Sequence, residues 1–112
     1  MRVLDLNKCP LTAALRVVGG KWKPIIILNL SKSSKRFGQL DYSIPKVSRK
    51  VLASQLSELV RDNLVTRHSY PESPPRVEYQ LTDKAREIVP IFEDMAKWGG
   101  YLIEADAKEG EN

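Results

Sequence analysis

The sequence is poor in the residues that build covalently linked or metal-bound cores. Its 112 residues contain one cysteine and one histidine, which excludes an intramolecular disulfide and leaves His68 without a second ligand near it in sequence. We therefore expect no bound metal and no other cofactor. The scarcity of cysteine also favours a reducing compartment, so we expect a cytoplasmic protein.

Long apolar runs are lacking as well. The longest, residues 25–28, is followed at once by Asn29, whereas a helix needs about 20 apolar residues to cross a bilayer. Residues 1–5 lack the long apolar region of a signal peptide. We expect no membrane partner. The length suits a single domain, residues 1–112, that can form a stable hydrophobic core without disulfides or a structural metal ion.

Charge is present but unevenly distributed. The formal net charge is +4, yet residues 1–63 contain 12 basic and 4 acidic residues, while residues 64–112 contain 6 basic and 10 acidic ones. A basic first half is typical of a protein that binds the phosphates of nucleic acid. The asymmetry alone is weak evidence, because many solvated surfaces are basic.

A first helix is expected over about residues 10–18. Pro10 is tolerated at the first helical position, where its missing N–H would be unpaired anyway. Leu11 and Leu15 lie on one apolar stripe, and Gly19 and Gly20 end the helix.

Three further helices are expected between residues 21 and 62. The first, about 21–30 with Pro24 in its first turn, is apolar enough to be the central core helix. A short helix over 36–42 and a longer one over 48–62 flank a turn through Pro45, which prevents the short helix from continuing. This arrangement predicts a helix-turn-helix over about residues 36–62.

The helix over 48–62 has two faces. Its apolar face carries Val51, Leu52, Leu56, Leu59 and Val60. The opposite face is small, polar and basic, so its side chains can donate to phosphate oxygens and base edges. An ordinary solvated surface helix would carry more glutamate. The side chains expected to contact DNA here and at the start of the short helix are Ser48, Arg49, Lys50, Ser54, Gln55, Ser57 and Arg36.

A basic hairpin follows. Asn63 ends the helix, since asparagine accepts a left-handed backbone. Two alternating runs, 64–70 and 76–81, flank a proline-rich tip and predict a β-hairpin. Arg67 and Arg76 would let this wing, about residues 64–81, reach DNA phosphates or the neighbouring minor groove.

The last helix is expected over about residues 83–105, capped by Thr82 and kinked or broken at Pro90. Its apolar stripe exceeds what a small domain can cover, so a second copy of the chain would bury it. The expected dimer interface combines both terminal helices and comprises Leu11, Leu15, Phe92, Met95, Trp98 and Leu102.

These features predict an α+β fold, mainly α, in which a winged helix-turn-helix with a small hairpin wing is flanked by N- and C-terminal dimerisation helices. The chain also resembles the HxlR family of bacterial and archaeal winged-helix transcription regulators over about residues 9–100. The resemblance is carried in order by residues 9–11, 19–22, 36–40, 47–52, 55–59, 70–79, 81–82 and 97–99. It implies a homodimer, not an enzyme, that binds an inverted-repeat operator in double-stranded DNA, with the 48–62 helix in the major groove. A small-molecule effector could bind such a regulator, but no residue pattern identifies one.

Cys9 has two interpretations. In several members of this family the cysteine at the start of the first helix senses electrophiles or oxidants, and a helix N-terminus next to Lys8 would stabilise its thiolate. A structural or inert thiol is the alternative. A thiol-dependent enzyme is disfavoured, because no Cys-x-x-Cys and no nearby histidine accompany Cys9. A winged helix that binds protein instead of DNA remains the alternative function.

Overall fold

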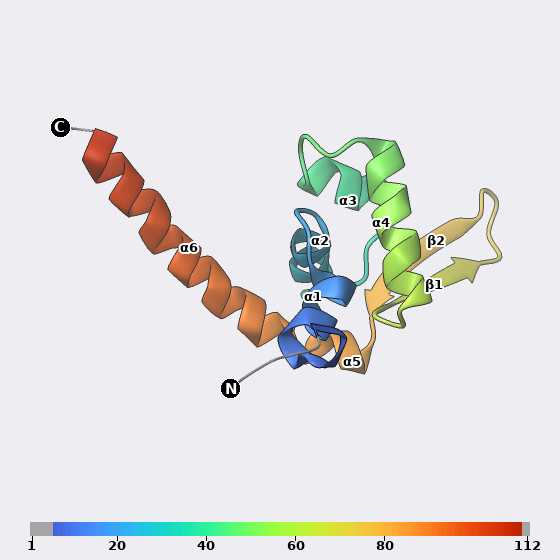
Figure 1. The fold of residues 1–112 in the computed structure, drawn as a ribbon. Coiled ribbons are helices and arrows are strands. Elements are labelled where there is room, and N and C mark those ends of the chain that lie inside the picture. The colour runs from blue at the N-terminus through green and yellow to red at the C-terminus, as the bar shows by residue number, and fades with distance from the viewer. Residues whose placement is uncertain (1–5, 111–112) are drawn as a thin grey trace.

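The computed structural model describes residues 6–110. The sequence indicates a polar arm without clear periodicity over residues 1–8, and most of it lies outside the described residues. The chain is mainly helical with one hairpin, as expected (Figure 1). Its elements are η1 (Leu6–Lys8), α1 (Pro10–Val18), α2 (Lys23–Leu30), α3 (Phe37–Ser43), α4 (Arg49–Arg61), β1 (Val65–Tyr70), β2 (Arg76–Leu81), α5 (Asp83–Arg86) and α6 (Val89–Gly110).

The core forms around α2, which packs against α3, α4, β2 and α6. Ile26, Ile27 and Leu30 are fully buried, which confirms α2 as the central core helix. α2 begins at Lys23 and not at Lys21 as expected, because the chain first makes a turn in which Gly20 has a positive φ of 95°. Other fully buried side chains, Leu40, Leu52, Leu56 and Leu59, come from α3 and α4.

The helix-turn-helix forms where expected, with well-defined helix starts. The Gln39 side chain accepts from the Arg36 backbone N–H at 2.8 Å, so α3 begins one residue later than predicted, at Phe37. Ser48 is the N-cap of α4, and its hydroxyl oxygen accepts from the Val51 N–H at 3.1 Å. α4 ends before Asn63, whose positive φ of 61° confirms its left-handed conformation.

The wing is an antiparallel hairpin in which Val65 pairs with Leu81 and Tyr70 pairs with Arg76. The first strand starts one residue later than predicted. The loop between α2 and α3 joins its other edge, since the backbone groups of Lys35 and Tyr79 exchange hydrogen bonds of 3.0 and 2.8 Å. The wing is therefore fixed to the helix-turn-helix rather than hanging freely.

The expected C-terminal helix is divided into α5 and α6. The break lies at residues 87–88, just ahead of Pro90, because a proline has no N–H for the Arg86 carbonyl four residues earlier and its ring clashes with that carbonyl. Thr82 caps α5, its hydroxyl oxygen accepting from the Ala85 N–H at 3.2 Å. α6 continues to Gly110, five residues beyond the expected end, through a segment rich in good helix formers.

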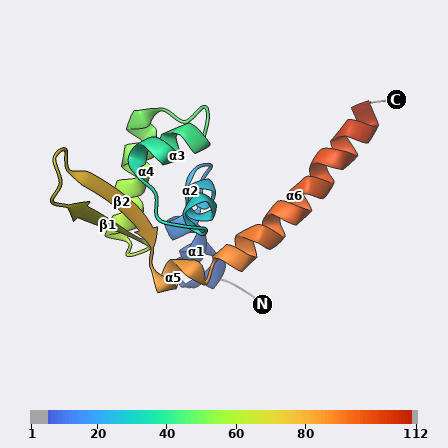
Figure 2. The same cartoon turned by 180° about the vertical axis from the view of Figure 1, so that it is seen from behind.

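α6 projects away from the rest of the fold in both opposite views (Figures 1 and 2), which gives the chain a longest dimension of 56 Å. Only its N-terminal part packs against the body, where Phe92 is 7% exposed and belongs to the core. Within residues 6–110, no helix combines the length and apolar character needed to span a membrane.

Candidate nucleic-acid interface

The outer face of α4 is exposed and largely unpaired. Lys50, Ser54 and Ser57 point away from the buried face formed by Leu52, Leu56 and Leu59, and all three are exposed. Within the described part of the chain, these three side chains make no hydrogen bond or ion pair. Their donors are therefore available to an external partner.

Gln55 lies on the flank of α4 and not on this outer face. It is half-buried, and its amide nitrogen donates to the Glu58 carboxylate at 2.9 Å. Glu58 also pairs with Lys23 of α2 at 3.7 Å and with Arg61 at 3.9 Å. Gln55 is thus engaged in a network between α2 and α4, in contrast to the free side chains beside it.

Arg49 is positioned by α3. Its guanidinium lies 3.5 Å from the Asp41 carboxylate and 5.4 Å from the centre of the Phe37 ring, and the side chain remains 72% exposed. Arg36, the N-cap residue of α3, is exposed. Stacking on an aromatic face orients a guanidinium without removing its donors from solvent.

The two wing arginines differ in their surroundings. Arg67 is exposed on β1 and borders a small hollow together with Ser57 of α4. Arg76 is half-buried, with its guanidinium 3.4 Å from Glu72, 3.7 Å from Glu78 and 4.2 Å from the centre of the Tyr70 ring. Within residues 6–110 Arg67 makes no hydrogen bond or ion pair, so it is available to an external partner, whereas Arg76 holds the wing tip together through its ion pairs.

A second exposed surface is apolar and lies on α1 and α6. Leu11 is 67% exposed and Trp98 65%, and Leu15, Met95 and Leu102 are also exposed. Phe92, which we expected in the dimer interface, is buried in the core of its own chain, so we remove it from that set. The remaining members are exposed apolar side chains of α1 and α6.

Cys9 is the N-cap residue of α1 and is partly exposed. The hydroxyl of Thr12, followed by the backbone N–H of Thr12, stabilises the thiolate and so lowers the pKa of Cys9. The N–H of Leu11 contributes in the same direction, while desolvation opposes it. A lowered pKa raises the reactive thiolate fraction near neutral pH.

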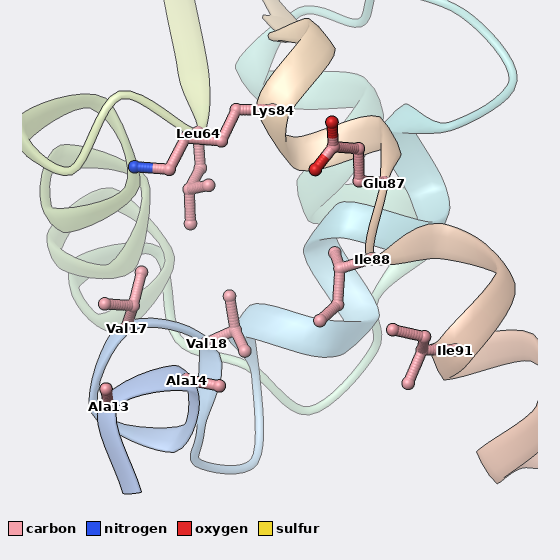
Figure 3. Close-up of a pocket in the computed structure, with 9 residues that line it drawn as sticks. All are labelled: Ala13, Ala14, Val17, Val18, Leu64, Lys84, Glu87, Ile88 and Ile91. Atoms are coloured by element: carbon pink, nitrogen blue, oxygen red, sulfur yellow. The ribbon is translucent and has the colours of Figure 1, made fainter. Parts of the chain in front are cut away.

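A groove of about 430 Å³ lies between α1, the junction of α4 with β1, and the break between α5 and α6. Figure 3 shows that apolar side chains such as Val17, Val18 and Ile88 line it, with Lys84 and Glu87 among the lining residues. The groove lies between the terminal helices and the wing domain, and a small-molecule effector of the kind considered from the sequence could bind there. That expectation stays a prediction.

Sequence reasoning missed two basic residues that the structure places in informative positions. Lys23 is 6% exposed and supports α4 through Glu58. Lys46, in the turn between α3 and α4, is exposed and has a positive φ of 76°. Its position directly after Pro45 was a usable signal, because proline followed by positive φ is the pattern of a type II turn.

No group of three or more potential metal ligands gathers within residues 6–110. His68 is exposed on β1, opposite Glu78.

Comparisons with known proteins find helix-turn-helix regulators of the HxlR-like and MarR types. The model of the HxlR-like helix-turn-helix matches residues 17–107. An uncharacterised HTH-type transcriptional regulator of Halalkalibacterium halodurans is 43% identical over 99 residues, which cover 88% of each chain. Among solved structures, the oxidised form of the redox regulator HypR is 39% identical with a TM-score of 0.79, covering 83% of this chain and 96% of HypR. A protein assigned to the MarR family from Porphyromonas gingivalis W83 is 35% identical with a TM-score of 0.83, covering 88% and 96%.

Proposed function

Because the chain belongs to the HxlR-like helix-turn-helix family, we propose that it is a transcriptional regulator that binds double-stranded DNA as a homodimer. One observation carries the proposal: the exposed face of α4 presents Lys50, Ser54 and Ser57 without intramolecular partners in the part of the chain that the structure describes. The relatives named as HTH-type transcriptional regulators support the same function.

In this proposal α4 enters the major groove, which is wide enough to admit one helix. Ser54 and Ser57 are small, so the helix axis can approach the base edges closely, and their hydroxyls can donate or accept there. Lys50 donates to a guanine edge or to a phosphate. Ser48, the N-cap residue of α4, lies at the N-terminal end of the same surface.

Arg49 needs a rearrangement on binding. Its pair with Asp41 is 72% exposed on the arginine side, so the pair contributes little to folding and is screened by solvent. A DNA phosphate, which bears a full negative charge, can replace the carboxylate as the guanidinium partner. Before DNA binds, Asp41 and Phe37 hold the guanidinium of Arg49 against α3.

The wing contacts DNA beside the groove. The exposed guanidinium of Arg67 would contact a phosphate from the wing, and that of Arg36, at the start of α3, would contact one from the helix-turn-helix. Arg76 would reach a phosphate only after leaving Glu72 and Glu78, so we assign it a smaller share of the binding free energy than Arg67.

The homodimer forms through α1 and α6. Leu11, Leu15, Met95, Trp98 and Leu102 are all exposed, and large exposed apolar surfaces mark sites of protein–protein contact. A two-fold dimer would bury the same surface on both copies. It would also present two α4 helices to an inverted repeat whose half-sites lie about one helical turn, or a multiple of it, apart.

Cys9 gives this regulator a means of sensing oxidants or electrophiles. Its pKa is lowered by Thr12, it is the only cysteine in the chain, and HypR, a similar protein of known structure, is named a redox regulator. Oxidation would join the Cys9 thiols of two subunits, or Cys9 and a small thiol, in a disulfide, with two electrons and two protons passing to the oxidant. Either product would sit at the start of α1, beside the dimer surface.

A nuclease-protection experiment tests the proposal. The probe is the DNA directly upstream of the protein's own gene, with the thiol oxidant diamide added in a second series. We expect two protected half-sites related by a two-fold axis, and a changed pattern after diamide in the wild type but not in Cys9→Ser. Absence of protection at any concentration that keeps the protein folded would favour the alternative, a winged helix that binds protein.

A further inference from the structure

Lys46 has an unusual backbone conformation. In residues 6–110, positive φ values occur at three positions, Gly20 (95°), Lys46 (76°) and Asn63 (61°). Glycine and asparagine tolerate the left-handed region, but a lysine there meets a clash between its Cβ and its own backbone. The chain therefore uses tolerant residue types at two such positions and a strained one at the turn between α3 and α4.

The surrounding turn imposes this conformation. Ile44 and Val47, on either side of Pro45 and Lys46, are 3% and 9% exposed and belong to the core. The Ile44 N–H donates to the Leu40 carbonyl at 3.0 Å, and Ser48 then caps α4. With both ends fixed and the ring of Pro45 restricting its own φ, Lys46 cannot adopt a relaxed conformation without displacing a core side chain.

The side chain has no partner that would explain the strain. Lys46 is exposed, and within the described part of the chain it makes no ion pair or hydrogen bond. Lys50 on α4 is likewise unpaired within the described residues, whereas Arg49 pairs with Asp41, and Lys23 and Arg61 pair with Glu58. The positive charge of Lys46 is thus available at the tip of the helix-turn-helix.

We propose that Lys46 forms a binding site for a backbone phosphate of DNA at the turn of the helix-turn-helix. The inference rests on the proposed function. In a helix-turn-helix complex the first helix crosses the DNA backbone and the second enters the groove, so the turn that joins α3 to α4 lies next to the phosphates at the groove edge. The local strain is retained because this position places an ammonium group there.

Two opposite effects of one substitution follow. Lys46→Gly removes the strain, so the melting temperature should rise by on the order of a few degrees. The same change removes a positive charge from the phosphate site, so DNA affinity should fall by roughly eightfold at 0.1 M salt, and the slope of log affinity against log salt should flatten by about 0.9. A substitution that stabilises the protein while weakening its binding is the signature of a residue kept for its partner.

Two further variants separate charge from flexibility. Lys46→Asn tolerates positive φ and keeps a Cβ but carries no charge, so it should weaken binding as Lys46→Gly does. Lys46→Arg keeps the charge and should bind like the wild type. Lys108→Asn, an exposed lysine in the last turn of α6, is the matched control and should change neither affinity nor slope.

The measurement is fluorescence anisotropy of a labelled duplex from the region directly upstream of the protein's own gene, titrated with the full chain at several salt concentrations. The expected result is weaker binding and a flatter slope for the Gly and Asn variants, with melting temperatures at or above that of the wild type. Unchanged binding in both variants, with the wild type bound, would overturn this inference and leave the proposed function standing. Failure of the wild type to bind would overturn both.

Discussion

The ammonium group of Lys23 lies 3.7 Å from the carboxylate of Glu58, across the contact between α2 and α4, although Lys23 is only 6% exposed. The same carboxylate accepts from Gln55 at 2.9 Å. A lysine is rarely so deeply buried without a partner of opposite charge. Glu58 therefore compensates the buried charge of α2 and fixes the flank of the helix that we propose to enter DNA.

Removing this carboxylate should destabilise the fold. Glu58→Gln would leave Lys23 buried without its counter-charge, at a cost of about 1–3 kcal/mol in the free energy of unfolding, toward the low end because the Glu58 side chain is 36% exposed. Lys23→Met, which replaces the charge by an apolar chain of similar length, should be nearly neutral. Urea denaturation at pH 7 measures both. The account fails here if Glu58→Gln is no less stable than Lys23→Met.

Self-association should depend on the apolar face of α6. Trp98→Asp places a charge in the proposed interface and should weaken dimerisation by at least roughly 30-fold, the equivalent of about 2 kcal/mol. The helical content should persist, because the Trp98 side chain is 65% exposed and does not belong to the core. Lys97→Ala, an exposed position next to Trp98 on the same helix, serves as the control. Sedimentation equilibrium showing equal association for all three proteins would contradict this interface.

The reactivity of Cys9 should depend on Thr12. Hydrogen bonding to Thr12 lowers the pKa of Cys9 in the folded chain. Near neutral pH, a larger fraction of this thiol is therefore ionised than of an ordinary cysteine thiol. Thr12→Val removes the hydroxyl, raises the pKa toward its ordinary value and should slow alkylation by iodoacetamide at about pH 7.5, below the ordinary thiol pKa. Thr66→Val, on the wing, is the control. An alkylation rate that Thr12→Val leaves unchanged would rule out this activation.

The sequence was sufficient for the parts of the fold that local chemistry decides. Several helix ends lie where predicted, because caps depend on residues that are neighbours in sequence. The helix α1 begins at Pro10, and α4 ends before Asn63. Ser48 and Thr82 are the N-cap residues of α4 and α5. Pro90 predicted a break correctly. The break falls two to three residues earlier because the clash acts on the carbonyl of Arg86.

What the sequence could not supply are relationships between distant residues. Phe92 and Trp98 belong to one apolar stripe by periodicity, but only the packing of α6 against α2 shows that Phe92 is buried in its own chain. Arg67 and Arg76 look equivalent in sequence. In the structure, however, it is Arg76 that forms ion pairs with Glu72 and Glu78. The outward direction of Lys50, Ser54 and Ser57 agrees with the periodicity, whereas the role of Gln55 required the position of Glu58.

The central claim is that the outer face of α4 binds DNA, and the most direct measurement is the salt dependence of binding for the wild type and Lys50→Ala on one duplex. We expect wild-type affinity to fall steeply between about 50 and 200 mM salt, and Lys50→Ala to bind more weakly, with a slope flatter by about 0.9 for each phosphate that the variant no longer neutralises. Lys108→Ala, remote from α4, should match the wild type. An affinity that ignores both salt and the removal of the Lys50 charge, in proteins with unchanged melting temperatures, would contradict the account.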